Sequence, residues 1–280
     1  MTTPTEAPAP ASKAGRNLPA AVAVGLLLAS VAVGSLVFDK RWFLVLAVAA
    51  MLTAVWELGG AMRNADIHLP TVPLYFGVVG TIVGGWFAGA GGVAIGMALS
   101  VLAVLLWRGV RGPQGFVTDA TSGALAVGYL LMAGGFATLL VREDDGPFRV
   151  LAWLLLVVAS DVGGYAMGVM VGKTPMAPSV SPKKSWEGFS GSVLACVTFG
   201  TLVVVFALDG QWWAGVVLGV AMAMAATLGD LAESLLKRDI GVKDMGSLLP
   251  GHGGVMDRLD SIALSAPVAW LVLTYLVPVA

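Results

Sequence analysis

Long apolar segments run through almost the whole of this chain, and they limit its fold more than any other feature. An α-helix needs about 20 apolar residues to cross the hydrocarbon core of a bilayer. Nine segments come close to or exceed that length, at residues 18–38, 42–62, 72–90, 91–107, 120–141, 148–172, 189–208, 212–236 and 259–279. Only a glycine-rich stretch around Gly89 separates the third from the fourth. We expect a break there, because one uninterrupted helix would be too long for a bilayer.

The composition also indicates a membrane protein. Of the 280 residues, 58% are hydrophobic, only 12% are charged and 37 are glycines, which allow helices to pack closely. We therefore predict an all-α polytopic membrane protein with about nine transmembrane helices. We expect a disordered N-terminal tail (1–17), an N-terminal transmembrane region of about five helices (18–141) and a C-terminal transmembrane region of about four (148–280). Two long loops, 173–188 and 237–256, belong to the C-terminal region.

The distribution of Lys and Arg predicts the orientation. When loops are assigned to alternate sides, twelve of the 16 basic residues fall on the side of the N-terminus. The other side receives only Lys40, Arg41, Arg142 and Arg149. Because cytoplasmic loops carry the excess of positive charge, we predict a cytoplasmic N-terminus and an external C-terminus.

Ionisable residues are concentrated between 229 and 261, at the second of these loops. Asp230 precedes Lys237 by seven residues, which places it about 10 Å inside the helix end. Glu233 and Lys237 follow on the same helical face. An ionised carboxylate at that depth costs about 3 kcal/mol or more unless it is paired or solvated, so Asp230 indicates a functional site.

A second acidic face stands at the start of the last segment. Asp257 and Asp260 are three residues apart and would share one side of a helix, at the membrane level of Asp230. The two acidic faces together would form an oxygen-rich site suited to a hard divalent cation such as Mg²⁺. Asp161 lies within the sixth segment, beside small residues that let a neighbouring helix or a substrate approach. For Asp161 and Glu233, a structural hydrogen bond between helices is an alternative explanation.

The two loops add groups that could bind phosphates. Lys183, Lys184 and Ser185 offer two cations and a hydroxyl, and Trp186 offers an aromatic face for a base. A positive-inside charge pair beside an interfacial Trp is the alternative. The glycines on both sides of His252 could bring backbone N–H groups to an anion, although a plain turn with a surface histidine would look the same.

Acids, cations and glycine loops gathered at one face of a bilayer favour phosphoryl or nucleotidyl transfer to a lipid. An ion-coupled transporter that uses Asp161, Asp230 and Glu233 as a relay is the main alternative. It predicts acids spread through the full depth of the bilayer.

Three stretches of the chain, with two upstream blocks, carry a more specific signal. They are 234–238 (Ser-Leu-Leu-Lys-Arg), Lys243-Asp244 and 249–260 (Leu-Pro-Gly-His-Gly-Gly-Val-Met-Asp-Arg-Leu-Asp), preceded by 181–188 and by Asp161 with Tyr165 and Gly168. Together they resemble the signature of the phosphatidate cytidylyltransferases, or CDP-diacylglycerol synthases, over roughly residues 150 to 265. The resemblance implies transfer of CMP from CTP to phosphatidate, giving CDP-diacylglycerol and pyrophosphate. It makes 148–280 the catalytic region, with 173–188 and 237–256 as its cytoplasmic loops.

The resemblance also implies cofactors, partners and a place in the cell. We expect Mg²⁺, with a second cation such as K⁺, in a homodimer of the cytoplasmic (inner) membrane whose active site faces the cytosol and which binds no nucleic acid. Asp230 and Asp257 correspond to the metal ligands, and Glu233 and Asp260 are further candidates. A CTP-dependent polyprenol kinase is the nearest alternative.

The remaining candidate residues are assigned to the two substrates. Lys237, Arg238 and Arg258 would receive the lipid phosphate or the leaving pyrophosphate. Lys183, Lys184 and the backbone of His252, Gly253 and Gly254 would hold the triphosphate. Ser185, Trp186, Asp161 and Lys243 complete the predicted substrate-binding set.

Overall fold

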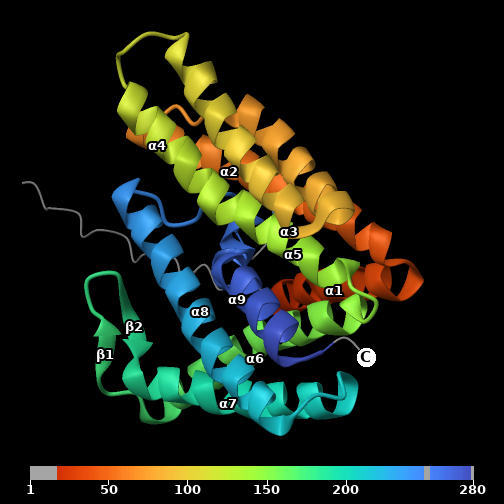
Figure 1. Cartoon of the computed structure of the whole chain (residues 1–280). Coiled ribbons are helices and arrows are strands. Elements are labelled where there is room, and N and C mark those ends of the chain that lie inside the picture. The colour runs from red at the N-terminus through yellow and green to blue at the C-terminus, as the bar shows by residue number, and fades with distance from the viewer. Residues whose placement is uncertain (1–17, 249–252, 279–280) are drawn as a thin grey trace, which may run out of the picture.

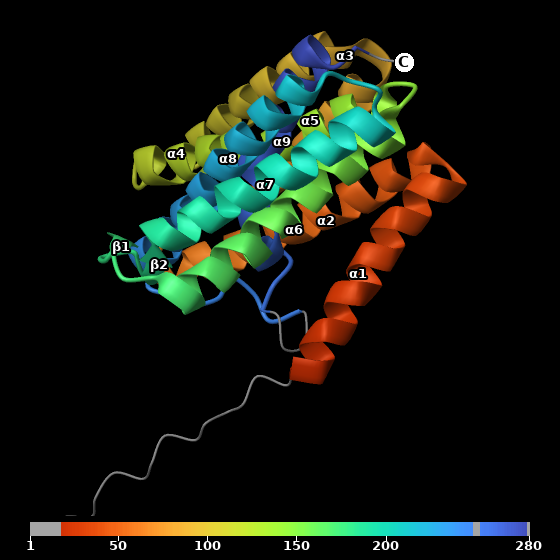
Figure 2. The same ribbon diagram turned by 90° about the horizontal axis from the view of Figure 1, so that it is seen from below.

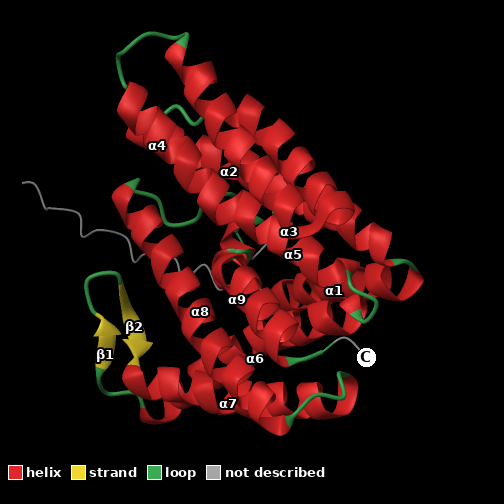
Figure 3. Ribbon diagram, viewed as in Figure 1, coloured by secondary structure: helices red, strands yellow, loops and turns green. Residues whose placement is uncertain are grey.

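A computed structural model describes residues 18–248 and 253–278, with side chains from residue 24 onward. Over these residues the protein is almost entirely helical. Within those residues a single two-stranded hairpin is the only sheet (Figure 1, Figure 3). The predicted all-α architecture is confirmed.

The N-terminal region begins with α1 (Leu18–Phe38) and α2 (Lys40–Met62), which a 3-10 turn, η1 (Arg63–Ala65), follows. Asp39 separates the two helices, and its side chain caps α2 by accepting the Arg41 backbone N–H at 2.8 Å. Figure 2 shows α1 leaning away from the rest of the bundle. Leu28 and Ala32 of α1 line the cavity described below.

The third element, α3 (Thr71–Gly109), is a hairpin of two helical arms. Gly89 has a φ of 64°, a left-handed conformation that glycine adopts without strain, and the chain reverses there. The arms are so close that a methyl group on Gly84 would lie 2.9 Å from the Gly92 carbonyl oxygen. The predicted break between segments 72–90 and 91–107 is confirmed.

A continuous helical rod follows, made of α4 (Phe116–Ala126), the π-helical turn η2 (Val127–Leu131) and α5 (Met132–Arg142). Such π turns inside α-helices frequently occur at functional sites. This one contains Tyr129, whose hydroxyl reaches the first residue of the last helix.

The C-terminal region contains four helices, and each packs against the next along the chain (Figure 2). Its elements are α6 (Gly146–Val171), β1 (Pro175–Ala177), β2 (Ser181–Ser185), α7 (Trp186–Ala207), α8 (Trp212–Asp239), the 3-10 turn η3 (Met256–Arg258) and α9 (Asp260–Leu276). Glycines bring α6 and α7 together, since a methyl group on Gly163 would lie 2.6 Å from the Gly191 carbonyl oxygen. The β1–β2 hairpin lies where the sequence predicted only a loop.

The outside of the bundle is apolar. Large side chains such as Phe76, Phe87 and Phe206 are exposed there. Of the helices in the described residues, six are long and apolar enough to cross a membrane. Exposed apolar surface of this extent requires lipid rather than water around it, so the chain is an integral membrane protein. The number of crossings and the sidedness stay predictions.

Two buried apolar clusters join the N-terminal and C-terminal regions. In the second cluster, Met245, Met256 and Leu259 pack together with Met62 of α2 and Val127 of η2. The segment that carries most of the predicted site therefore rests directly on the N-terminal helices.

Candidate active site

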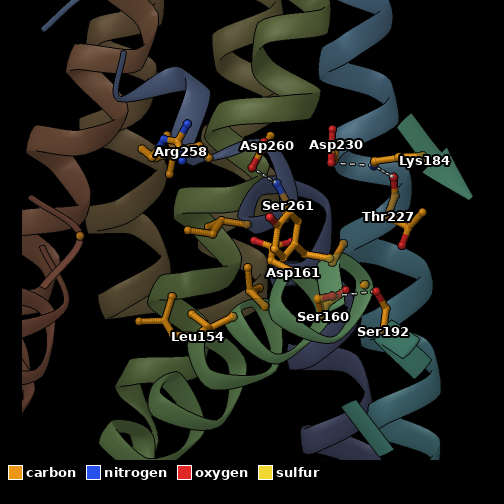
Figure 4. Close-up of a pocket in the computed structure, with 18 of the residues that line it drawn as sticks. Leu154, Ser160, Asp161, Lys184, Ser192, Thr227, Asp230, Arg258, Asp260 and Ser261 are labelled. Carbon is orange, nitrogen blue, oxygen red and sulfur yellow. Dashed lines mark hydrogen bonds and ion pairs between the residues drawn. The ribbon is translucent and has the colours of Figure 1, made fainter. Parts of the chain in front are cut away.

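A cavity of about 770 Å³ lies between α1, α2, α6, the hairpin, α8 and the start of α9. Leu28 of α1, Leu46 of α2 and Leu154 of α6 contribute to an apolar wall. Figure 4 shows Leu154 on one side of the cavity, with Asp230 and Asp260 on the other. The cavity thus combines an apolar surface with a charged one.

Three acids reach this cavity from three different helices. Asp161 comes from α6, Asp230 from α8 and Asp260 from the first residue of α9 (Figure 4). The Ser234 hydroxyl donates to Asp230 Oδ1 at 3.3 Å, and the Ser261 backbone N–H donates to Asp260 Oδ1 at 2.6 Å. Three carboxylates that share one cavity create a strongly negative potential, which attracts cations.

Lys184 meets this negative charge. Its Nζ lies 2.6 Å from Asp230 Oδ2 and 3.5 Å from the Thr227 carbonyl oxygen. Both side chains of the pair remain partly open, with 22% of Lys184 and 34% of Asp230 exposed. The ion pair is therefore accessible from the cavity, and a phosphate could compete for the lysine.

The hairpin sets the position of Lys184. Strands β1 and β2 pair antiparallel, with Pro175 opposite Ser185. Glu187 closes the base of the hairpin, because its carboxylate accepts the backbone N–H of Thr174 at 3.1 Å and the Thr174 hydroxyl at 2.8 Å. Ser185 caps α7 by accepting the Gly188 N–H at 3.1 Å. These bonds fix the strand that brings Lys183 and Lys184 to the cavity.

A second charged cluster is buried beside the cavity. Lys237 Nζ lies 2.8 Å from Glu233 Oε2 and 2.6 Å from Asp257 Oδ1. Asp257 also accepts the backbone N–H of Met245 at 3.0 Å and that of Gly254 at 2.7 Å. Burial alone would raise the pKa of Asp257, but the bonds from Lys237, Met245 and Gly254 hold it below its usual range. Asp257 thus connects the end of α8 with the segments on both sides of residues 249–252.

The structure brings most of the predicted site residues together, in two groups. The cavity is lined by Asp161, Lys183, Lys184, Ser185, Asp230, Arg258 and Asp260. The buried cluster holds Glu233, Lys237 and Asp257, with Gly254 beside it and Gly253 next to it in a left-handed conformation. Trp186, Arg238 and Lys243 do not line the cavity. The prediction for His252 lies outside the described residues.

Two expectations differ from the structure. Asp257 and Asp260 do not share a helix face: Asp257 lies in η3 and turns inward, whereas α9 begins at Asp260, which faces the cavity. Asp257 turns inward because its carboxylate accepts the backbone N–H groups of Met245 and Gly254. Gly254 N–H is therefore occupied here rather than free for a phosphate. A metal ion held by both Asp230 and Asp257 stays a prediction.

The sequence reasoning overlooked two residues of the N-terminal region that contact the backbone between Met256 and Asp260. Glu57 of α2 accepts the Met256 backbone N–H at 2.8 Å. The Tyr129 hydroxyl donates to the Asp260 carbonyl oxygen at 3.1 Å. Glu57 could have been found, because it is an acid within an apolar segment, as Asp230 is. No comparable signal distinguishes Tyr129.

A cavity with an apolar wall and a charged end, inside an integral membrane protein, is suited to an enzyme that acts on a charged group linked to lipid. The model of the Cytidylyltransferase family matches residues 19–276, and the chain belongs to that family.

Individual relatives agree with this assignment. A phosphatidate cytidylyltransferase of Mycobacterium leprae is 42% identical over 281 residues, covering 94% of this chain and 90% of the relative. Its counterpart in Mycobacterium tuberculosis (strain H37Rv) is 40% identical over 278 residues, covering 95% and 85%. One from Helicobacter pylori (strain 26695) is 43% identical over 133 residues, about half of each chain (48% and 50%).

Proposed function

We propose that this protein transfers CMP from CTP to phosphatidate, giving CDP-diacylglycerol and pyrophosphate. The observation that carries the proposal is the single cavity that joins an apolar wall to Asp161, Asp230, Asp260, Lys184 and Arg258. Phosphatidate needs both surfaces, one for acyl chains and one for its phosphate. Membership of the cytidylyltransferase family supports CTP as the second substrate.

The reaction needs no strong general base. Phosphatidate is already anionic near neutral pH, so one of its phosphate oxygens can attack the α-phosphorus of CTP. A new P–O bond forms, the bond from the α-phosphorus to the bridging oxygen breaks, and pyrophosphate leaves with that electron pair. Catalysis then consists of aligning the two phosphates and neutralising the charge that grows on the leaving group.

The cavity cations are suited to this task. Lys183 and Lys184 lie together on β2, and Arg258 faces the same cavity from η3. Lys184 would exchange its bond with Asp230 for one with a CTP phosphate, since the pair is open to the cavity. Arg258, which lies on η3 rather than on the hairpin, would bind the phosphate of the lipid. Lys237 is bound to Glu233 and Asp257, so it would act by holding the buried cluster in place.

The acids fit a hard divalent cation. Asp161, Asp230 and Asp260 offer carboxylate oxygens to one cavity. No cluster of three acidic, His or Cys side chains surrounds a common metal position in the described part of the chain. Mg²⁺ usually takes one or two carboxylates and completes its shell with water and substrate phosphates, so two of these acids would suffice. Asp230 and Asp260 would hold it from the cavity. When bound, Mg²⁺ would neutralise charge on the triphosphate.

We further propose that the protein lies in the inner membrane and that its charged cavity opens to the cytosol. Lys183, Lys184 and Arg258 belong to the loops of the side that collects most of the basic residues. CTP is a cytosolic nucleotide, so this orientation would give it direct access.

Release of pyrophosphate tests the proposal. Purified protein in phosphatidate-containing vesicles, with CTP and Mg²⁺, should release pyrophosphate at a rate that depends on phosphatidate. A matched vesicle in which diacylglycerol replaces phosphatidate serves as the control. Pyrophosphate release that is absent, or equal in both vesicles, would contradict the proposal, and ion flux without CTP turnover would favour a transporter.

A further inference from the structure

We propose that Glu57 and Tyr129, from outside the catalytic region, are positioning residues that hold the segment from Gly254 to Ser261 in its reactive geometry. The inference rests on the proposed function and adds to it a role for the N-terminal helices. Neither residue lines the cavity, so each would act through the backbone of a residue that does or that lies beside it.

Glu57 binds the segment at its start. Glu57 lies toward the C-terminal end of α2 and is only 3% exposed. Oε2 accepts the Met256 backbone N–H at 2.8 Å, although the two residues are 199 positions apart. Met256 opens η3 and directly precedes Asp257. A shift of Met256 would therefore move Asp257 and Arg258 together.

The shape of the loop is adapted to this carboxylate. A methyl group on Gly246 would lie 2.5 Å from Glu57 Cδ, and one on Gly254 would lie 2.6 Å from it. Glycine at both positions lets the carboxylate enter between them. Burying a carboxylate costs free energy that an apolar side chain of similar size would not, so Glu57 is a poor choice for packing alone. Its direct effect is on the position of the backbone that it binds.

Tyr129 acts at the other end of the segment. Its hydroxyl lies 3.1 Å from the Asp260 carbonyl oxygen and 3.5 Å from the Gly229 carbonyl oxygen. Gly229 directly precedes Asp230, so one hydroxyl contacts both helices at the level where the two cavity acids emerge. The two helices are close at this point, because a methyl group on Gly229 of α8 would lie 3.3 Å from Ser261 Cα of α9. Tyr129 therefore sets the spacing of Asp230 and Asp260.

Four variants test the inference in the full-length protein, by CDP-diacylglycerol formation and by thermal unfolding in detergent. Glu57→Ala removes the acceptor for Met256, and Glu57→Gln keeps one. Tyr129→Phe removes only a hydroxyl. Asp119→Asn is the matched control, since Asp119 is also buried (5% exposed) and bonded to Arg108 at 2.7 Å, but it contacts neither the cavity nor the 254–261 segment among the bonds of the described residues.

We expect kcat per folded molecule to fall about 10- to 100-fold in Glu57→Ala, since a buried N–H loses its acceptor, and about threefold or less in Glu57→Gln. Tyr129→Phe should lower kcat about 3- to 10-fold. The KM for CTP should change by less than about threefold, because Lys183 and Lys184 are untouched. Asp119→Asn should lower the midpoint of unfolding but leave kcat per folded molecule unchanged.

Two results would overturn the inference while the wild type is active. One is wild-type kcat per folded molecule in both Glu57→Ala and Tyr129→Phe. The other is an equal loss of kcat in Asp119→Asn, which would mean that any buried polar change has this effect. If Glu57→Ala does not fold, Tyr129→Phe decides: wild-type kcat per folded molecule in that variant would overturn the inference. A wild-type protein that forms no CDP-diacylglycerol would instead overturn the proposed function.

Discussion

Replacing Lys184 by alanine should separate catalysis from stability. The ion pair with Asp230 is partly exposed, with 22% and 34% of the two side chains open. Screening by water limits such a pair to about 0–1 kcal/mol of folding free energy. For a chain of this size the midpoint of thermal unfolding should then fall by no more than about 4 °C. The same lysine should matter far more in the reaction, where charge grows on the leaving pyrophosphate.

The expected loss of activity follows from this electrostatic role. Removing one preorganised group that stabilises developing charge typically costs about 10²–10³ in kcat. We expect a loss of that size for Lys184→Ala in vesicles with saturating CTP and phosphatidate. Lys173→Ala is the control, because Lys173 is an exposed lysine just before the same hairpin that does not line the cavity. Turnover of Lys184→Ala within threefold of the wild type, or a loss fully explained by unfolding, would refute the reasoning.

Three other predictions concern the buried charges and the metal. Asp257→Asn should lose about 2–4 kcal/mol of stability at pH 7, measured by denaturant titration, because Lys237 and two backbone N–H groups lose their charged partner. Since the pKa of Asp257 is lowered in the folded protein, that difference should be constant above about pH 4 and shrink as the pH falls further. Equal stability of the two proteins at pH 7 would contradict it. Arg149→Met should cost about 3 kcal/mol, because Arg149 is 1% exposed and bonds two carbonyls at the end of α9, yet kcat per folded molecule should not change. Chelation of Mg²⁺ should stop turnover reversibly. Full activity in the presence of the chelator would contradict the proposed role of the metal.

The fold was predictable where a local property of the sequence determines it. Apolar length gave the helices, and Gly89 lies within the glycines that predicted the break in α3. The β1–β2 hairpin was not predictable in this way. Its strands are short and rich in Pro, Lys and Ser, and they depend on Glu187 accepting bonds from Thr174. The sequence contains both partners, but it does not indicate that they meet.

The candidate site divides along the same line. The sequence identifies Asp161, Asp230 and Asp260 as candidates because they are acids in apolar surroundings. All three line the cavity. The inward turn of Asp257 depends on the Met245 N–H, a backbone group that no residue type marks in advance. Tyr129 likewise makes its bond to the Asp260 backbone from a π turn. Long-range bonds to the backbone are thus the part of the site that composition and spacing do not indicate.

The fate of the two ends of the CTP triphosphate tests the central claim most directly. Vesicles containing phosphatidate and the purified protein are incubated with CTP labelled at either the α- or the γ-phosphate, and lipid and water-soluble products are then separated. Our account predicts that the α-label appears in the lipid and the γ-label in pyrophosphate. A γ-label in the lipid, as a kinase would produce, would contradict it.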